Sequence, residues 1–170
     1  ASNDRSHALI GVWAMNRGMH VYLEKPIAVS VEECRLLRKT YNANRGKIST
    51  QLGTQRSGHV NLRRVKDLIR DGAVGTLQSV QAWTTSESVC DGYLPAAGNP
   101  PSTLHYDLWL GPAPYHPYNP DYFGSCGKWQ KYWDFGTGQL GNWGSHIADI
   151  AWMAMEGGLP LNASGEGDAY

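Results

Sequence analysis

A lysine between a glutamate and a proline ends the first strand-like apolar run of the chain. In "HVYLEKP" the apolar residues stop at Leu23, and Glu24, Lys25 and Pro26 follow directly. Ligands of open parallel sheets bind beyond the carboxyl ends of the strands, so these charged side chains could meet a ligand there. Pro26 prevents the strand from continuing as an interior one and would hold Lys25 in one direction. A plain surface ion pair is the alternative, and these three residues alone favour it.

A histidine in "GNWGSHIADIAWMAM" is the second candidate for chemistry. Imidazole titrates near neutral pH, so His146 is suited to act as a general base. A place in the first turn of a helix would favour its neutral form. Asp149 shares its helix face and could orient the ring or bind a hydroxyl, and Asn142 could cap the helix and contact a substrate. A half-buried structural histidine is the alternative for His146.

Alternating helical and strand-like patterns are expected to position these residues. Ser30 and Glu33 form a capping box, which marks the start of a helix. The order helix, strand, helix, strand in the first part predicts a parallel, doubly wound layer. Residues 88–139 are rich in Gly, Pro, Trp and Tyr, and are either a functional loop or a segment that contains short elements. The sequence predicts a first helix over residues 4–18, which Asp4 or Ser6 could cap. It predicts further helices over residues 30–44, 60–72 and 141–155, and strands over residues 20–23, 47–53 and 76–87.

Two segments of the chain together resemble the Gfo/Idh/MocA oxidoreductases. "HALIGVWAMNRGMHVYLEKPIAVSVEEC" contains a helix led by histidine, then Gly-x-His-Val and the Glu-Lys-Pro signature. "GTGQLGNWGSHIADIAW" resembles the motif G-x-L-x-D-x-G-x-H-x-x-D, with Asn142 at the place of the first aspartate. "DLIRDGAVGTLQSVQAW" and "WLGPAP" extend the likeness over essentially the whole chain. Two motifs in this order are far more specific than either motif alone.

The resemblance implies an NAD- or NADP-dependent oxidoreductase that acts on a sugar, polyol or related cyclic alcohol. It implies that residues 1–55 are the C-terminal part of a Rossmann domain with a parallel sheet. Residues 56–170 would be an incomplete α+β domain for substrate binding and oligomerisation, with an open, mostly antiparallel sheet. The family's glycine-rich turn should lie before Ala1, so we expect a piece of a longer protein. An NAD-dependent glycoside hydrolase and a non-catalytic sugar or nucleotide sensor are alternative functions on the same fold.

The resemblance also implies roles for individual residues. Lys25 would lie between nicotinamide and substrate and donate to the reacting oxygen, and His146 would be the base. Two structural roles are equally good alternatives to contacts with the ligands. His7 could cap a helix, and Gln55 and Arg56 could belong to a polar linker. The residues expected to contact the cofactor are Asn3, which replaces the family's proline, His7, Glu24, Lys25, Pro26 and Gln55. The residues expected to contact the substrate are Asn142, Asp149, Arg56, Trp129 and Tyr132.

Four aromatic residues could stack on sugar faces: Trp109, Trp129, Tyr132 and Trp133. At least half of them are expected to pack in a core instead, because that is the more common place for such side chains. His105 and His116 have no partners at the spacing of metal ligands, so we predict no metal site.

The composition is that of a globular protein. The 170 residues have a net charge of zero, 41% are hydrophobic and 18% are charged, which suggests neither a nucleic-acid nor a membrane partner. No apolar run approaches the roughly 18 residues that a membrane span needs. Three widely spaced cysteines (Cys34, Cys90 and Cys126) predict no disulfide framework and no structural zinc. We expect a homo-oligomer when the protein is full length, in the cytoplasm or alternatively in the periplasm.

Overall fold

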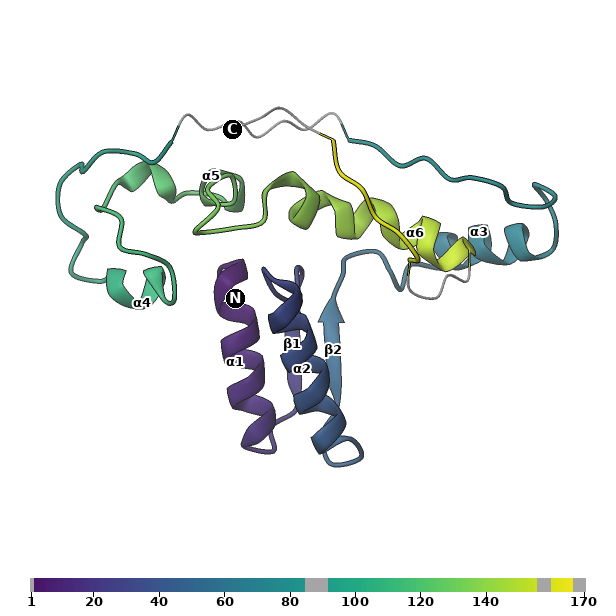
Figure 1. The fold of residues 1–170 in the computed structure, drawn as a ribbon, viewed down its shortest axis with the longest axis horizontal. Coiled ribbons are helices and arrows are strands. Elements are labelled where there is room, and N and C mark those ends of the chain that lie inside the picture. Colours follow the sequence, from purple (N-terminus) through teal and green to yellow (C-terminus); the bar gives the residue numbers. More distant parts are fainter. Residues whose placement is uncertain (1, 85–91, 156–159, 167–170) are drawn as a thin grey trace.

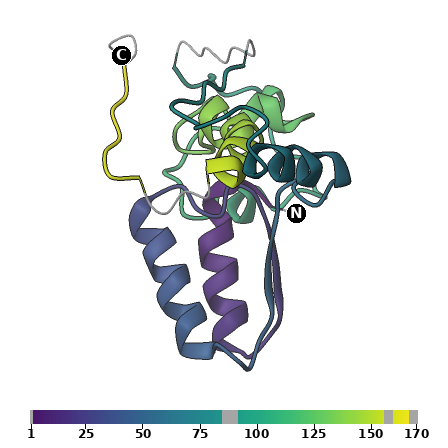
Figure 2. The same ribbon diagram turned by 90° about the vertical axis from the view of Figure 1, so that its right-hand side faces the viewer.

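The lower part of the molecule is a small α/β layer (Figure 1). The computed structural model describes residues 2–84, 92–155 and 160–166. The layer is built from α1 (Asp4–Asn16), β1 (Val21–Glu24), α2 (Val31–Asn44) and β2 (Thr50–Gly53). The two strands pair in parallel, with Val21 opposite Thr50 and Glu24 opposite Gly53. Both helices lie on the same side of the strands (Figure 2). The parallel pairing predicted from the alternating pattern is therefore confirmed, whereas the doubly wound arrangement, which needs helices on both faces, is not seen in the described residues (Figure 2).

A close approach of α1 to the sheet and to α2 holds this layer together. A Cβ atom on Gly11 would lie 2.8 Å from Leu23 Cδ1 and 2.9 Å from Leu37 Cδ2, so a larger residue would displace both leucines. Buried Ala8 and Met15 of α1 pack with Leu37 in the same hydrophobic cluster. The core formed by α1 and α2 thus packs against β1, the strand whose end carries the Glu-Lys-Pro run.

The predicted start of α2 is confirmed, whereas that of α1 needs a correction. Ser30 Oγ accepts from Glu33 N at 3.2 Å, and Glu33 Oε2 accepts from Ser30 N at 3.3 Å, which is the full capping box. The N-cap of α1 is Asn3, without a side-chain cap bond, and Asp4 is already helical. The Asp4 carboxylate makes a tertiary hydrogen bond instead, as described below.

The remaining elements extend across the top of this layer (Figure 1). The described part of residues 88–139, which were predicted as a loop or as short elements, contains short helices. The helix predicted over residues 141–155 begins with a π-helical turn. The elements are α3 (Val60–Arg70), α4 (Tyr106–Leu110), the 3₁₀ helix η1 (Pro120–Tyr122), α5 (Cys126–Trp129), the π-helical η2 (Leu140–Gly144) and α6 (Ser145–Met155). A second core, which we call the aromatic cluster, consists of Tyr106, Leu110, Tyr122, Tyr132 and Phe135.

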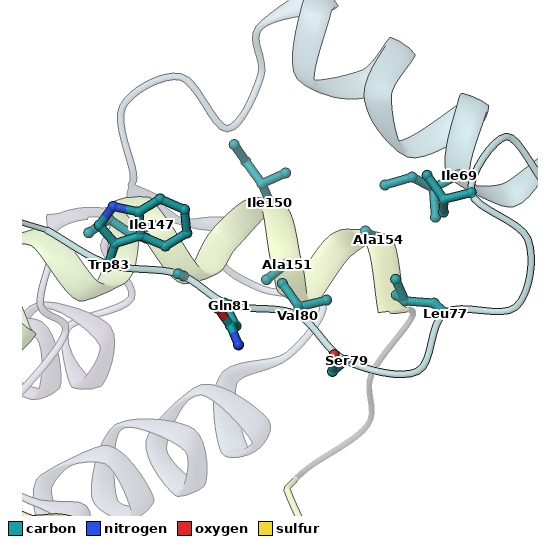
Figure 3. Close-up of a pocket in the computed structure, with 12 residues that line it drawn as sticks. Ile69, Leu77, Ser79, Val80, Gln81, Trp83, Ile147, Ile150, Ala151 and Ala154 are labelled. Atoms are coloured by element: carbon teal, nitrogen blue, oxygen red, sulfur yellow. The ribbon is translucent and has the colours of Figure 1, made fainter.

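The long strand predicted over residues 76–87 is wrong for its described part. Residues 76–84 form no strand, and residues 85–87 lie outside the described ranges. Alternating polarity marks a half-buried segment, but a strand also needs a neighbouring strand to pair with, and neither of the described strands pairs with residues 76–84. Leu77, Val80 and Trp83 instead lie beside α6 along an apolar cavity (Figure 3). The open, mostly antiparallel sheet is accordingly not seen in the described residues.

Arg5 connects the α/β layer to the aromatic cluster. Its Nε donates to Leu110 O at 2.6 Å, its Nη1 donates to Phe135 O at 3.0 Å, and its Nη2 donates to Trp109 O. The guanidinium carbon also lies 4.8 Å from the ring centroids of Trp109 and Phe135. Burial lowers the pKa of Arg5 to about 10. One side chain from the first turn of α1 thus holds two segments that are more than a hundred residues away.

We expect Arg5→Met to lower the free energy of unfolding by about 3 kcal/mol, because it leaves three carbonyl oxygens without their donors. Arg5→Lys should recover only part of the loss, since an ammonium cannot reproduce the planar fork. Urea unfolding measures both effects. Arg17→Met is the matched control, because Arg17 is exposed and its side chain donates to Trp13 O, one turn earlier in the same helical segment. Equal unfolding midpoints for Arg5→Met and the wild type would contradict this role.

Candidate functional site

A cavity of about 420 Å³ lies at the carboxyl ends of β1 and β2. It combines residues from the α/β layer with residues from the segments above it. The predicted site residues that line it are His7, Glu24, Lys25, Gln55, Arg56, Trp129, Asn142 and His146. Ser2, Asp4, Gln130 and Trp143 also line it, and the sequence had not indicated them as site residues. We call this space the central cavity.

A larger cavity, of about 550 Å³, lies between α6 and the segment that contains Leu77, Val80 and Trp83 (Figure 3). Its lining contains no titratable side chain. Proton transfer needs groups that can gain or lose a proton, so the central cavity is the better candidate for a reaction despite its smaller volume.

Lys25 spans the central cavity from the end of β1 to the helical segment above. Its Nζ donates to Asn142 O at 2.9 Å and also to Asn142 Oδ1, across 117 positions of sequence. The peptide bond between Lys25 and Pro26 is cis. Lys25 is therefore held by a neutral amide group, which accepts its hydrogen bonds without neutralising its charge.

His146 lines the same cavity, and its surroundings lower the pKa of its imidazole. Burial is the largest cause, followed by the positive charges of Lys25 and Arg56. A hydrogen bond to the backbone of Gln55 and the negative charge of Asp149 oppose the shift without cancelling it. The net effect favours the neutral ring, which is the form that can accept a proton.

The physical reason that the sequence suggested for a neutral His146 needs a correction. The histidine was expected in the first turn of a helix, where the dipole acts most strongly. Because η2 leads directly into α6 at Ser145, the helical backbone begins before His146. The dipole effect falls off within the first turn, so burial and the two nearby cations replace it as the cause.

His7 and Asn3 stabilise the loops around the cavity. The His7 ring lies between two carbonyl oxygens, with Nδ1 2.6 Å from Pro26 O and Nε2 3.2 Å from Ser2 O. It thereby connects α1 to the turn that carries Lys25. Asn3 does not line the cavity; its Nδ2 donates to Trp109 O at 3.0 Å. Its expected contact with a cofactor is replaced by a structural bond.

Asp4 is a site residue that the sequence analysis treated only as a possible helix cap. It is 2% exposed, and its Oδ2 accepts from Thr137 Oγ1 at 2.8 Å. Burial raises the pKa of the Asp4 carboxyl, while the Thr137 hydrogen bond and the charges of His7 and Lys25 act in the opposite direction. Asp4 thus brings a buried carboxyl to the cavity and fastens the loop that precedes η2. No local sequence signal marks this role, because Thr137 is 133 positions away.

The aromatic residues divide between the cavity and the core. Trp129 and Trp143 line the central cavity, and the Trp143 ring lies 6.2 Å from that of His146. Tyr132 is only 3% exposed and packs against Tyr122 and Phe135 in the aromatic cluster. The expected contact of Tyr132 with a substrate is therefore replaced by core packing.

The other aromatic and acidic candidates also lie away from the cavity wall. Trp109 packs against the aromatic cluster, and Trp133 is 73% exposed. Pro26 and Asp149 do not line the cavity, although the charge of Asp149 reaches His146. Within the described ranges, no group of three or more His, Cys, Asp or Glu side chains could hold a metal ion. None of the helices described is long and apolar enough to cross a membrane.

The run Gly136–Gly141, "GTGQLG", has the spacing of a dinucleotide-binding turn but a different structural role. A Rossmann turn directly follows a strand, whereas the described element directly before this run is the short helix α5. A Cβ atom on Gly136 would lie 2.6 Å from Gln130 Cα, and one on Gly141 would lie 1.8 Å from Thr137 Oγ1. These two glycines permit close packing of the loop, so we assign no phosphate site to the run.

Known proteins resemble this chain in part. Residues 60–157, more than half of the chain, match the model of an oxidoreductase family's C-terminal α/β domain, of Gfo/Idh/MocA type. Inositol 2-dehydrogenase of Salmonella typhimurium (strain LT2) is 33% identical over 75 residues, which are 44% of this chain and 22% of that protein. Inositol 2-dehydrogenase 3 of Saccharopolyspora erythraea is 35% identical over 71 residues, or 42% and 21% of the two chains. The matches thus span about a fifth of the length of these curated relatives.

Proposed function

Because the chain belongs to the Gfo/Idh/MocA oxidoreductase family, we propose that it transfers a hydride between NAD or NADP and a cyclic polyol or sugar. One observation carries the proposal: Lys25 and His146 line one cavity at the carboxyl ends of parallel strands. That edge of a parallel sheet is where ligands of such folds bind. The expected homo-oligomer and the cellular compartment stay predictions.

The residues at the strand ends fit the nicotinamide end of a dinucleotide. A nicotinamide would supply the hydride chemistry when bound, while the protein positions and polarises. Glu24 and Lys25 at the end of β1, and Gln55 just after β2, line the cavity with polar groups that could hold its carboxamide and ribose. The His7 ring, on α1, contacts Pro26 O and so helps to hold the turn that carries Lys25.

The proposed reaction divides proton handling between two residues. Lys25 Nζ donates to the oxygen of the reacting alcohol, and His146 accepts the hydroxyl proton as the general base. Asn142 keeps the lysine amine in place through its side-chain oxygen. Asn142 carries no charge, so it leaves the positive charge of Lys25 unneutralised. Together with burial, the largest cause, this charge lowers the pKa of His146 and favours the neutral imidazole that can accept a proton. An aspartate at position 142 would weaken that effect.

The walls of the cavity support a ring-shaped, polar substrate. Trp129 and Trp143 offer aromatic faces that pair well with the C–H surfaces of a sugar or polyol ring. The two relatives carry the name inositol 2-dehydrogenase. Inositol is therefore the first substrate to test.

An assay of the protein with NAD⁺ or NADP⁺ and a panel of inositols, sugars and linear polyols tests the proposal. We expect reduced cofactor to form in equal amount with a ketone product from at least one cyclic polyol. Nitrophenyl glycosides in a parallel assay would expose a glycoside hydrolase, through release of nitrophenol without net reduction of the cofactor. Cofactor binding without turnover of any cyclic polyol would contradict the proposal and favour a sensor.

A further inference from the structure

Arg56 lines the central cavity in a backbone conformation that arginine rarely adopts. Its φ is 69°, and among the described residues it is the only one other than glycine with a positive φ. A side chain in this left-handed region costs free energy, and such residues are concentrated at ligand sites. The exposed side chain of Arg56 therefore deserves a functional explanation.

A tight turn after β2 holds the backbone of Arg56 in this conformation. Ser57 N donates to Thr54 O at 3.3 Å, so Arg56 occupies the third position of a four-residue turn. A positive φ at that position usually calls for glycine or asparagine. Arg56 O accepts from His59 N at 2.7 Å, directly before α3. Bonds on both sides thus fix the place from which the arginine reaches the cavity.

The positive charge of Arg56 has no counterion within the described part of the chain. No carboxylate there lies within ion-pair distance of its guanidinium, and the guanidinium donates no hydrogen bond there. Lys25, the other cation of the central cavity, is held by the neutral Asn142. The cavity thus contains two positive side chains, and neither is paired with a carboxylate.

The two carboxyl groups that line the cavity have other neighbours. Asp4 is 2% exposed, its Oδ2 accepts from Thr137, and burial raises the pKa of its carboxyl, which favours the uncharged form. The Glu24 carboxylate lies against β2, because a Cβ atom on Gly53 would be 2.9 Å from Glu24 Oε1. A negative group that pairs with Arg56 would therefore have to come from a ligand.

The place of Arg56 favours the substrate as the source of that negative group. Arg56 lines the same cavity as His146, the proposed base, and its charge acts on the His146 ring. A group bound to Arg56 would thus lie beside the reacting alcohol. The planar fork of a guanidinium matches the two oxygens of a carboxylate, which it binds through parallel hydrogen bonds.

We propose that Arg56 binds a carboxylate on the substrate, so that the central cavity selects an acidic sugar over its neutral counterpart. This inference rests on the proposed function and narrows it to rings that carry both the reacting alcohol and a carboxylate. A neutral ring leaves the arginine without its counterion and is bound less tightly.

The test compares acidic sugars with neutral sugars of the same ring. Calorimetry with saturating reduced cofactor measures the Kd of glucuronate and galacturonate, and of glucose and galactose. We expect the wild type to bind the acids about tenfold or more tightly than their counterparts, and Arg56→Gln to lose this preference. Arg56→Lys should keep part of it, since an ammonium retains the charge without the fork. Arg35→Gln, at an exposed arginine of α2, is the matched control.

A second titration distinguishes a substrate carboxylate from a phosphate of the cofactor. Fluorescence measures the Kd of NADH and NADPH, and both values should be the same in Arg56→Gln as in the wild type. A weaker cofactor Kd together with an unchanged preference for acids would overturn the inference, because the anion would then belong to the cofactor. Equal binding of acidic and neutral sugars by the wild type would overturn it as well.

Thermal unfolding checks for a purely structural role. Because the Arg56 guanidinium has no partner among the described residues, Arg56→Gln should unfold at the same temperature as the wild type. A lower unfolding temperature with the preference for acids intact would assign the arginine to stability and overturn the inference.

Turnover separates this inference from the proposed function. Oxidation of neutral and acidic rings with equal kcat/KM would overturn the inference and leave the proposed function standing. Arg56-dependent binding of acids without oxidation of any ring would support the recognition role and contradict the proposed function.

Discussion

Lys25→Met should lower kcat about a thousandfold while changing the Kd of the cofactor only slightly. A positioned proton donor contributes roughly 10²- to 10⁴-fold to such reactions, and the methionine has no donor to offer the reacting oxygen. Asn142 holds the Lys25 amine at the central cavity, where it can donate to a bound substrate. Steady-state kinetics with the best cyclic polyol, together with cofactor titration, give both quantities.

Lys39→Met is the matched control for this substitution. Lys39 lies on the exposed face of α2, so its replacement removes the same charge far from the cavity and should leave kcat unchanged. Lys25→Arg should recover little activity, because a guanidinium is larger and its donors lie in a fixed fork. Full turnover by Lys25→Met would exclude the lysine from the chemistry and would remove the main support of the proposed function.

His146→Gln should lower kcat/KM by roughly 10²- to 10⁴-fold, because the amide cannot accept a proton near neutral pH. In the wild type, kcat/KM should fall with decreasing pH as the imidazole becomes protonated. Because burial, Lys25 and Arg56 lower the pKa of His146 below its ordinary 6.5, this decrease should occur below pH 6.5. The pH profile with saturating cofactor measures the position of the decrease.

Two charge variants test the physical cause of that shift in opposite directions. Arg56→Gln removes a positive charge that lowers the pKa of His146, so the acidic limb should move to higher pH. Asp149→Asn removes a negative charge that raises the pKa, so the limb should move to lower pH. Titration of the His146 ring by NMR in each variant gives the same pKa without turnover. A limb that stays in place in both variants would show that another group controls the profile.

The comparison of neighbouring aromatic residues shows the limit of reasoning from residue type. Trp129 and Tyr132 are three positions apart in one segment, and both are suited to a sugar face. Only Trp129 lines the central cavity, while Tyr132 completes the aromatic cluster. The direction in which each side chain points depends on the turn between them and on the core it meets. Neither can be derived from composition.

The local elements of the fold were determined by the sequence itself. The capping box at Ser30, the helical periods and the alternation of helix and strand depend on residues a few positions apart, and these act wherever the segment lies. The Glu-Lys-Pro run likewise indicated where Lys25 would lie, because ligands of parallel sheets bind beyond the carboxyl ends of the strands.

The tertiary structure alone decided which polar groups find partners. The Asp4–Thr137 bond joins residues 133 positions apart, and Arg5 reaches carbonyl oxygens of two distant segments. The absence of a strand over residues 76–84, despite their alternating polarity, is likewise a property of the surroundings. Hydrogen bonding depends on what the folded chain brings within about 3 Å, and the spacing of residues along the chain does not specify that.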